Sequence, residues 1–188
     1  MLFLNSLSLY LSLVDNEADK TKVEVVYMRH AREMMYVAYD ILQNQDDAED
    51  AAHNSMLKII RHIDKVDIDQ ELRTKHFVWT VTKNTAIDMY RRRKRRNEAF
   101  YDDIENWEMP GDVRDYYGES EAMKKLMAAI RKLSPKDRDA FYLHYMHRMD
   151  YKEIADIIGS NLNNTRQRVF RAKNKIKEYM EQLNIEDL

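Results

Sequence analysis

The stretch Tyr151–Lys177, "YKEIADIIGSNLNNTRQRVFRAKNKIK", predicts two helices joined by a tight turn. Asp150 and Glu153 stand in the capping-box spacing at the start of the first helix. That helix is expected to end at Gly159, because glycine accepts the left-handed backbone that a sharp turn requires. The second helix is expected to begin near Asn161–Asn163 and to bury a residue every three or four positions. A short helix, a glycine turn and a second helix make a helix-turn-helix.

The second predicted helix carries its charge on the face away from the core. From Asn161 to Lys177 there are six basic residues and no acidic one. Asn, Gln and Arg can bond to base edges in the DNA major groove, whereas Lys and flanking Arg suit phosphates. The predicted base contacts are Asn163, Asn164, Arg166, Gln167 and Arg171. The predicted phosphate contacts are Arg168, Lys173 and Lys175. Phe170 would touch a thymine methyl or pack on the domain, and a basic helix that only meets solvent is the alternative to DNA binding.

A second basic cluster ends the stretch Asn84–Arg96, "NTAIDMYRRRKRR". Six consecutive cations, Arg91–Arg96, stand in a chain whose formal net charge is only −2. The next segment, Asn97–Ala122, reverses the sign, since it holds nine acidic residues and one Arg and so has a net charge of −8. It also contains proline and glycine and shows no sustained helical period, which predicts a flexible linker. A loosely packed surface excursion is the alternative.

The composition favours helices throughout. Only three Gly and two Pro occur in 188 residues, which leaves little material for hairpin turns. Apolar residues recur with helical spacing at 27–42, 48–63 and 77–89, and Asp46 is the expected cap of the second segment. We therefore predict an all-α protein, with two small helical domains joined by an acidic flexible linker and the helix-turn-helix in the second domain. The expected limits are 1–20 for an N-terminal extension, 21–96 for the first domain, 97–120 for the linker and 121–188 for the second domain.

The N-terminal segment Met1–Val14, "MLFLNSLSLYLSLV", is apolar but lacks the features of a targeting signal. No basic residue precedes the apolar run, no cleavage site is obvious, and the run is too short to span a bilayer. An additional amphipathic or buried helix is the favoured prediction. A frayed extension and membrane contact are the alternatives, and we expect no stable membrane insertion.

The sequence offers no catalytic or metal-binding constellation. It contains no Cys, which excludes disulfides, thiolate zinc sites and Cys-based catalysis. His144 and His147 are three residues apart, but no third ligand is in view, so we expect them at the surface or in domain packing. The acidic run at 46–50 has no matching cluster of ligands elsewhere. We predict no metal, no cofactor and no enzymatic activity; a metal-dependent nuclease would need converging carboxylates.

Three segments, in order, resemble bacterial RNA polymerase sigma factors of the extracytoplasmic-function (ECF) group, within the sigma-70-type family. Ile41–Ile59, "ILQNQDDAEDAAHNSMLKI", resembles region 2.2 of the family, and Phe77–Arg93, "FVWTVTKNTAIDMYRRR", is similar to the end of region 2. Ile130–Gly159 and Thr165–Lys173 resemble region 4. The resemblance covers roughly residues 24 to 182. It implies promoter recognition as a dissociable subunit of bacterial RNA polymerase.

The resemblance also implies roles for particular residues. Region 2 is expected to recognise the −10 promoter element and help to melt it, and region 4 is expected to bind the −35 element through the helix-turn-helix. The implied polymerase-binding residues are Asp47, Glu49, Asp50, His53 and Asn54. The implied −10 contacts are Asn84, Asp88, Arg91, Arg92, Arg93, Lys94, Arg95 and Arg96.

The implied partners are core RNA polymerase, promoter DNA and an anti-sigma factor, and the implied location is the cytoplasm. Three positions depart from the family pattern. His53 stands where Gln is usual, Asn164 replaces a common Thr, and Ser160 replaces Ile or Val. The alternative interpretation of the protein's function is a regulator that binds DNA without polymerase, or a degenerate sigma-like activator.

Overall fold

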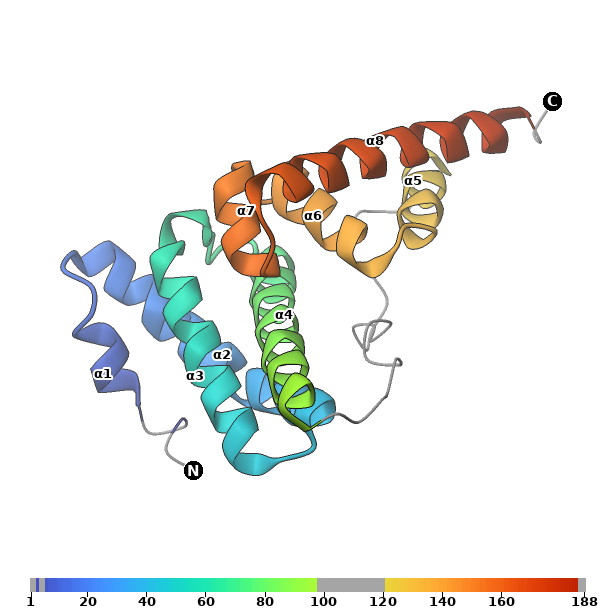
Figure 1. Ribbon diagram of the computed structural model, residues 1–188. Helices are drawn as coiled ribbons and strands as arrows, with labels where there is room; N and C mark the ends of the chain where they lie inside the picture. Colours follow the sequence, from blue (N-terminus) through green and yellow to red (C-terminus); the bar gives the residue numbers. More distant parts are fainter. Residues whose placement is uncertain (1–2, 4–5, 98–120, 186–188) are drawn as a thin grey trace. The chain divides into compact units, whose positions relative to one another are not determined.

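The computed structural model describes residue 3 and residues 6–97 and 121–185, and these ranges contain helices and no strand (Figure 1). Two compact units divide the chain, one within residues 1–107 and the other within residues 108–188. The predicted all-α fold with two helical domains is confirmed. The predicted linker, residues 97–120, lies outside the described residues except for Asn97, and the exact domain limits stay predictions.

The first unit is built from α2 (Glu17–Leu42), α3 (Gln45–Arg61) and α4 (Glu71–Asn97), which pack side by side (Figure 1). Two smaller elements complete it, α1 (Leu7–Leu11) and the 3-10 turn η2 (Ile63–Lys65). The three predicted apolar stripes are buried between the long helices, so the helical spacing located the core. Fully or almost fully buried members are Ala31, Met34, Ala38, Ala48, Ala51, Ile59, Phe77, Val78 and Val81.

Two helix starts in this unit differ from the predictions. The cap of α3 is Asn44, not Asp46, because the Asn44 side chain accepts the backbone N–H of Asp47 at 2.9 Å. Asp46 therefore lies inside the first turn, where the positive end of the helix dipole stabilises a negative charge. Helix α4 begins at Glu71, six residues before the expected start at Phe77. Its first turns are polar, so hydrophobic spacing did not reveal them.

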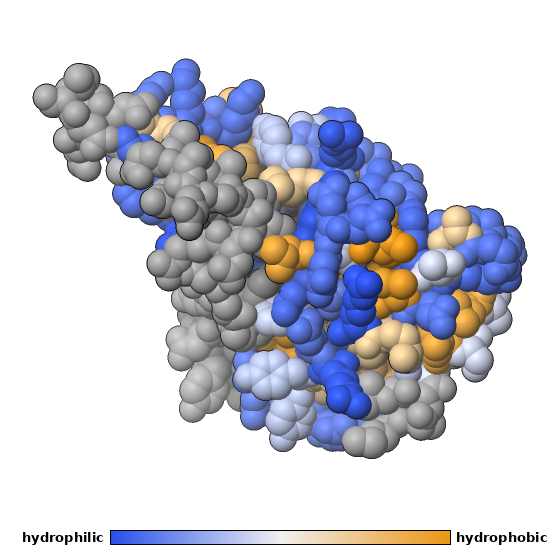
Figure 2. All heavy atoms as spheres, turned by 180° about the vertical axis from the view of Figure 1, so that it is seen from behind, coloured by the Kyte–Doolittle hydropathy of each residue, from blue (hydrophilic) through white to orange (hydrophobic). Residues whose placement is uncertain are grey.

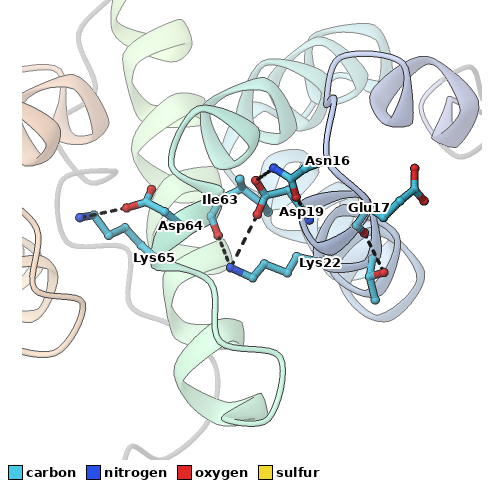
Figure 3. Close-up of polar contacts among 8 residues, drawn as sticks. Asn16, Glu17, Asp19, Lys22, Ile63, Asp64 and Lys65 are labelled. Atoms are coloured by element: carbon cyan, nitrogen blue, oxygen red, sulfur yellow. Dashed lines mark hydrogen bonds and ion pairs between the residues drawn. The ribbon is translucent and has the colours of Figure 1, made fainter.

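The N-terminal end of α2 is held by a local polar network (Figure 3). Asn16 caps the helix and accepts the backbone N–H of Asp19 at 2.7 Å. Lys22 lies 3.8 Å from the Asp19 carboxylate and donates to the Ile63 carbonyl at 3.3 Å. Because Ile63 belongs to η2, this lysine links the start of α2 to the segment between α3 and α4.

The N-terminal segment forms the predicted additional helix and packs on α2 and α3. Phe3 and Tyr10 are buried, and their rings form a cluster with Tyr27 at centroid distances of 5.8 to 6.2 Å. The Tyr27 hydroxyl donates to the Phe3 carbonyl at 2.8 Å, and a 2.8 Å hydrogen bond joins the Tyr10 hydroxyl and His53 Nδ1. Burial raises the pKa of Tyr10, so its hydroxyl stays protonated. None of the helices described here is long and apolar enough to cross a membrane.

A cluster around Glu33 joins α2 to α4. One carboxylate oxygen accepts Trp79 Nε1–H at 3.1 Å and His30 Nδ1–H at 3.2 Å, and the other meets Lys75 Nζ at 2.9 Å. Burial lowers the pKa of His30, which keeps the ring neutral. Burial alone would raise the pKa of Glu33, but the hydrogen bonds from Lys75, Trp79 and His30 together lower it. Trp79 is therefore a core residue with a satisfied N–H.

The second unit contains α5 (Glu121–Arg131), α6 (Pro135–Tyr145), α7 (Tyr151–Ile158) and α8 (Leu162–Ile185). The predicted capping box of Asp150 and Glu153 is present, and Gly159 takes the left-handed conformation, with φ 61° and ψ 44°. The Ser160 N–H then donates to the Ala155 carbonyl at 3.0 Å and closes the turn. Core residues of this unit include Ala129, Ile130, Leu133, Leu143, Ile154, Ile157, Val169, Ala172 and Ile176.

We predict that Glu33→Ala lowers the free energy of unfolding of the first unit by about 1–3 kcal/mol, because it leaves buried donors without their acceptor. Glu24→Ala, at an exposed position on the same helix, is the control and should change it by less than about 0.5 kcal/mol. Urea denaturation measures both. Equal effects of the two substitutions would contradict the assigned role of Glu33.

The same cluster predicts the pH dependence of stability. His30 and Glu33 both have pKa values lowered by folding, from ordinary values of 6.5 and 4.5. Groups of this kind stabilise the fold above their unfolded pKa and lose that contribution as the pH falls through the folded value. The difference in unfolding free energy between the wild-type chain and Glu33→Ala should therefore shrink below pH 4.5.

Tyr10→Ala should detach the N-terminal segment, since truncating a buried aromatic costs about 3–5 kcal/mol and a five-residue helix has little stability of its own. Hydrogen exchange followed by mass spectrometry should show loss of protection at residues 7–14. Leu9→Ala removes a side chain that is half exposed and should leave the protection unchanged. Full protection in the Tyr10 variant would show that its ring does not hold α1.

Candidate nucleic-acid interface

The outward face of α8 carries the side chains that the sequence predicted there. Four residues of its inner stripe, Thr165, Val169, Ala172 and Ile176, are buried. Helical geometry turns the opposite side to solvent, and the exposed residues on it include Asn163, Asn164, Gln167, Arg171, Lys173, Asn174 and Lys175. Phe170 is 65% exposed, so most of its side chain faces solvent and not the core of its domain. Between Asn161 and Lys177 the face combines amide, guanidinium and aromatic groups and holds no acidic residue.

The start of α8 is fixed by its own sequence. Asn161 accepts the backbone N–H of Asn164 at 2.8 Å, and the Thr165 hydroxyl donates to the Asn161 carbonyl at 2.9 Å. A rigid first turn matters because the N-terminal residues of such a helix normally enter the groove most deeply. The amide side chains of Asn163 and Asn164 therefore stand on an ordered scaffold.

Arg166 lies against α7 on one flank of the helix. Its guanidinium is 5.7 Å from the centre of the Tyr151 ring, a cation–π distance. Tyr151 stacks in turn on His144 at 5.0 Å, and His144 Nδ1–H donates to the Met149 carbonyl at 2.9 Å. His147 is buried, so both histidines belong to domain packing, as predicted. Within residues 6–97 and 121–185, no group of three possible metal ligands occurs.

Arg168 and Arg171 lie on the other flank and meet an acidic residue of α6. Asp137 Oδ1 accepts Arg171 Nη2–H at 3.1 Å and lies 3.5 Å from Arg168 Nη1. The Asp137 side chain is only 6% exposed. Two of the predicted DNA contacts are therefore held by a buried carboxylate.

The basic run of the first unit belongs to the last turns of α4. Arg91 is partly exposed, and Arg92 and Arg93 are exposed. The side chains of Lys94, Arg95 and Arg96 lie outside the described residues. The six cations thus occupy consecutive positions at the end of α4, and such a run of positive charge suits contacts with phosphates.

Arg93 also has a partner within its own unit. It forms an ion pair with Asp47 and donates to the Leu42 carbonyl at 3.1 Å. These two acceptors belong to the start of α3 and the end of α2. Arg93 therefore ties the turn between those helices to α4.

Asn84 and Asp88 differ in their exposure. Asn84 is 8% exposed, and its amide donates to the Thr80 carbonyl at 2.8 Å, one turn earlier in α4. Asp88 is partly exposed. An Asn84 contact with DNA is thus limited to a small accessible edge of the side chain.

The implied polymerase-binding residues lie together on α3. Asp50 and Asn54 are exposed and lie one turn apart, while Asp47, Glu49 and His53 are partly exposed. Asn54 contacts the Met89 sulfur of α4 at 4.0 Å, and His53 is bonded to Tyr10 of α1. The ridge of α3 therefore runs between α4 on one side and the N-terminal segment on the other. Figure 2 shows one face of the molecule, on which hydrophilic residues predominate and apolar residues form small groups.

Two family models match the chain. Sigma-70 region 2 covers residues 26–96 and sigma-70 region 4 covers residues 123–176, together about two thirds of the sequence. Both models fall on the described helices that carry the two basic surfaces. The chain belongs to the ECF group of the sigma-70 family. This sigma factor directs promoter-specific transcription initiation, the function of that family, and the family assignment made from the sequence is confirmed.

Named relatives agree with this assignment. The ECF RNA polymerase sigma factor SigE of Mycolicibacterium smegmatis is 29% identical over 156 residues, which cover 81% of this chain and 59% of the relative. The RNA polymerase sigma factor SigV of Bacillus subtilis is 26% identical over 159 residues, which cover 85% of this chain and 89% of the relative. The solved sigma factor RpoE of Bartonella quintana, in complex with the anti-sigma factor NepR, is 22% identical, with coverage of 80% and 91% and a TM-score of 0.37. At that TM-score the likeness does not bear on the fold.

Sequence patterns did not reveal the partners that orient these residues. Asp137 was recognisable only as an acidic residue near a helix start, and Tyr10 only as part of an apolar run. Asp137 is 31 and 34 positions away from its two arginines, and Tyr10 is 43 positions from His53. No local spacing rule connects residues so far apart.

We predict that the cations of α4 are not equivalent. Arg93→Ala should lower the free energy of unfolding by about 1 kcal/mol, because it removes a partly exposed ion pair and a bond to a carbonyl. Arg92→Ala, at the adjacent exposed position, should change it by less than about 0.5 kcal/mol. Thermal or urea unfolding compares the two variants, and identical stabilities would contradict a structural role for Arg93.

Proposed function

We propose that this sigma factor selects promoters through two separate surfaces, one in each unit. The observation that carries the proposal is the outward face of α8, where amide and guanidinium groups gather on a helix that follows a glycine turn. In a helix-turn-helix the second helix enters the major groove. We assign this face to the upstream, −35 type of promoter element.

Within α8, selectivity and affinity divide between different side chains. Amide and guanidinium groups can form two hydrogen bonds at once with a base edge. The proposed base contacts are therefore Asn163, Asn164, Arg166, Gln167 and Arg171. Arg168, Lys173 and Lys175 are the proposed phosphate contacts. The exposed Phe170 would meet a thymine methyl.

In the first unit, the end of α4 is the proposed contact with the −10 type of element. The proposed phosphate contacts there are Arg91, Arg92, Arg93, Lys94, Arg95 and Arg96. Asp88 would lie at the edge of this contact. Asn84 would contribute through its accessible edge or by shaping α4, since its amide is bonded to the helix backbone. Cations on a rigid helix stabilise separated strands without selecting a sequence.

The ridge of α3 is the proposed site for core RNA polymerase. Asp47, Glu49, Asp50, His53 and Asn54 present acidic and polar groups, which suit a basic surface on the partner. The acidic segment 97–120 would be repelled by DNA and would leave both basic surfaces available. We further propose an anti-sigma factor as a regulatory partner and a cytoplasmic location, where the chromosome and polymerase are found.

The test is transcription with bacterial core polymerase and fragments of the source genome as templates. Adding the full chain should produce transcripts from specific start sites and should allow the chain to co-purify with core polymerase. Gln167→Ala should reduce the preference for the upstream element about tenfold, the usual effect of one lost base contact. Glu178→Ala, at an exposed position later in α8, is the matched control and should leave that preference unchanged. A chain that neither binds core polymerase nor directs initiation would overturn the proposal.

A further inference from the structure

Asp137 is a buried acidic residue set against a helix whose outward face is cationic. It lies in the first turn of α6, and its side chain is 6% exposed. Its Oδ1 atom accepts Arg171 Nη2–H at 3.1 Å and lies 3.5 Å from Arg168 Nη1. One carboxylate therefore bridges two arginines that are one turn apart on α8.

The capped start of α6 fixes the backbone of Asp137 independently of the arginines. Ser134 caps the helix and accepts the Asp137 N–H at 3.4 Å, and Pro135 occupies the first turn. An anion at this position is also favoured by the helix dipole. A buried carboxylate is costly unless it is paired, so Asp137 draws both guanidinium groups toward a fixed point.

The two arginines are accessible to different degrees. The Arg168 side chain is 23% exposed, whereas that of Arg171 is 50% exposed. Arg171 lies one helical turn after Gln167, on the side of the outward face that borders Arg168 and α6. Arg168 lies farther round the helix, toward α6. The buried acid thus holds Arg171 by one edge while half of that side chain still faces outward.

We propose that Asp137 is a positioning residue for promoter selectivity. It holds the Arg171 guanidinium in the orientation from which it contacts a base edge, and Arg168 braces the same carboxylate from the inner side. An arginine that is oriented before binding loses less side-chain rotamer entropy when it contacts DNA. Its planar N–H donors also match the acceptor atoms of one base edge better than those of the others. This inference rests on the proposed function, in which α8 meets the upstream promoter element.

The test uses holoenzyme assembled from core polymerase and the full chain, with DNA duplexes randomised over the upstream element. Asp137→Asn keeps the side-chain shape but removes the charge. Its preference at the base position that depends on Arg171 should fall about tenfold. Its affinity for unselected duplex should not fall, because a negative charge near the phosphates has been removed. Asp137→Glu should recover part of the preference.

Asp156→Asn is the matched control, since it makes the same charge change at an exposed position on α7. The base preference should be unchanged in this control. A preference in Asp137→Asn that stays within about twofold of the wild-type value would overturn the inference. So would equal losses of preference in the two variants.

A double-mutant cycle separates positioning from a general folding defect. In the Arg171→Gln background, Asp137→Asn should cause no further loss of base preference. A second loss of the same size as in the wild-type background would mean that Asp137 acts through the fold, and it would overturn the inference. Wild-type holoenzyme with no preference anywhere in the randomised element would instead overturn the proposed function.

Discussion

Burial of one stripe along each long helix is the constraint on which both units depend. In α8, the buried side chains Val169, Ala172 and Ile176 leave only one possible orientation of the helix on its neighbours. Since a helix turns about 100° per residue, that orientation also decides which side chains face outward. Core packing and the proposed DNA-facing surface are therefore two results of the same spacing. A change that rotated the helix would lose both together.

Acidic and aromatic anchors give the cations different roles. Asp47 holds Arg93, Asp137 holds Arg168 and Arg171, and the Tyr151 ring lies beside Arg166. A cationic side chain that is paired with an acidic or aromatic residue has one preferred orientation. A cationic side chain that extends into solvent can turn toward any nearby phosphate. Positive charge favours binding to DNA, and these contacts fix the orientation of particular cationic side chains.

Two unusual features of the sequence, the apolar N-terminal segment and His53, are in contact in the folded protein. The apolar N-terminal segment was an added helix of unknown role, and His53 was a departure from the usual Gln of the family. The Tyr10 hydroxyl bonds His53 Nδ1 at 2.8 Å, so the segment covers one side of the ridge on α3. Neither feature explains the other in the sequence, because 43 residues separate them. The aromatic cluster with Phe3 and Tyr27 brings them together.

The sequence by itself determined the helical class, the helix-turn-helix, the outward face of α8 and the family, because these depend on local spacing and on residue type. It missed the early start of α4 and placed the cap of α3 two residues too late, since polar first turns carry no hydrophobic signal. Only the tertiary structure decided that Asn84 is buried, that Phe170 is exposed and that Asp137 holds two arginines. Those outcomes depend on which side chains meet after the helices pack, and residues 31 to 46 positions apart in the sequence meet only through that packing.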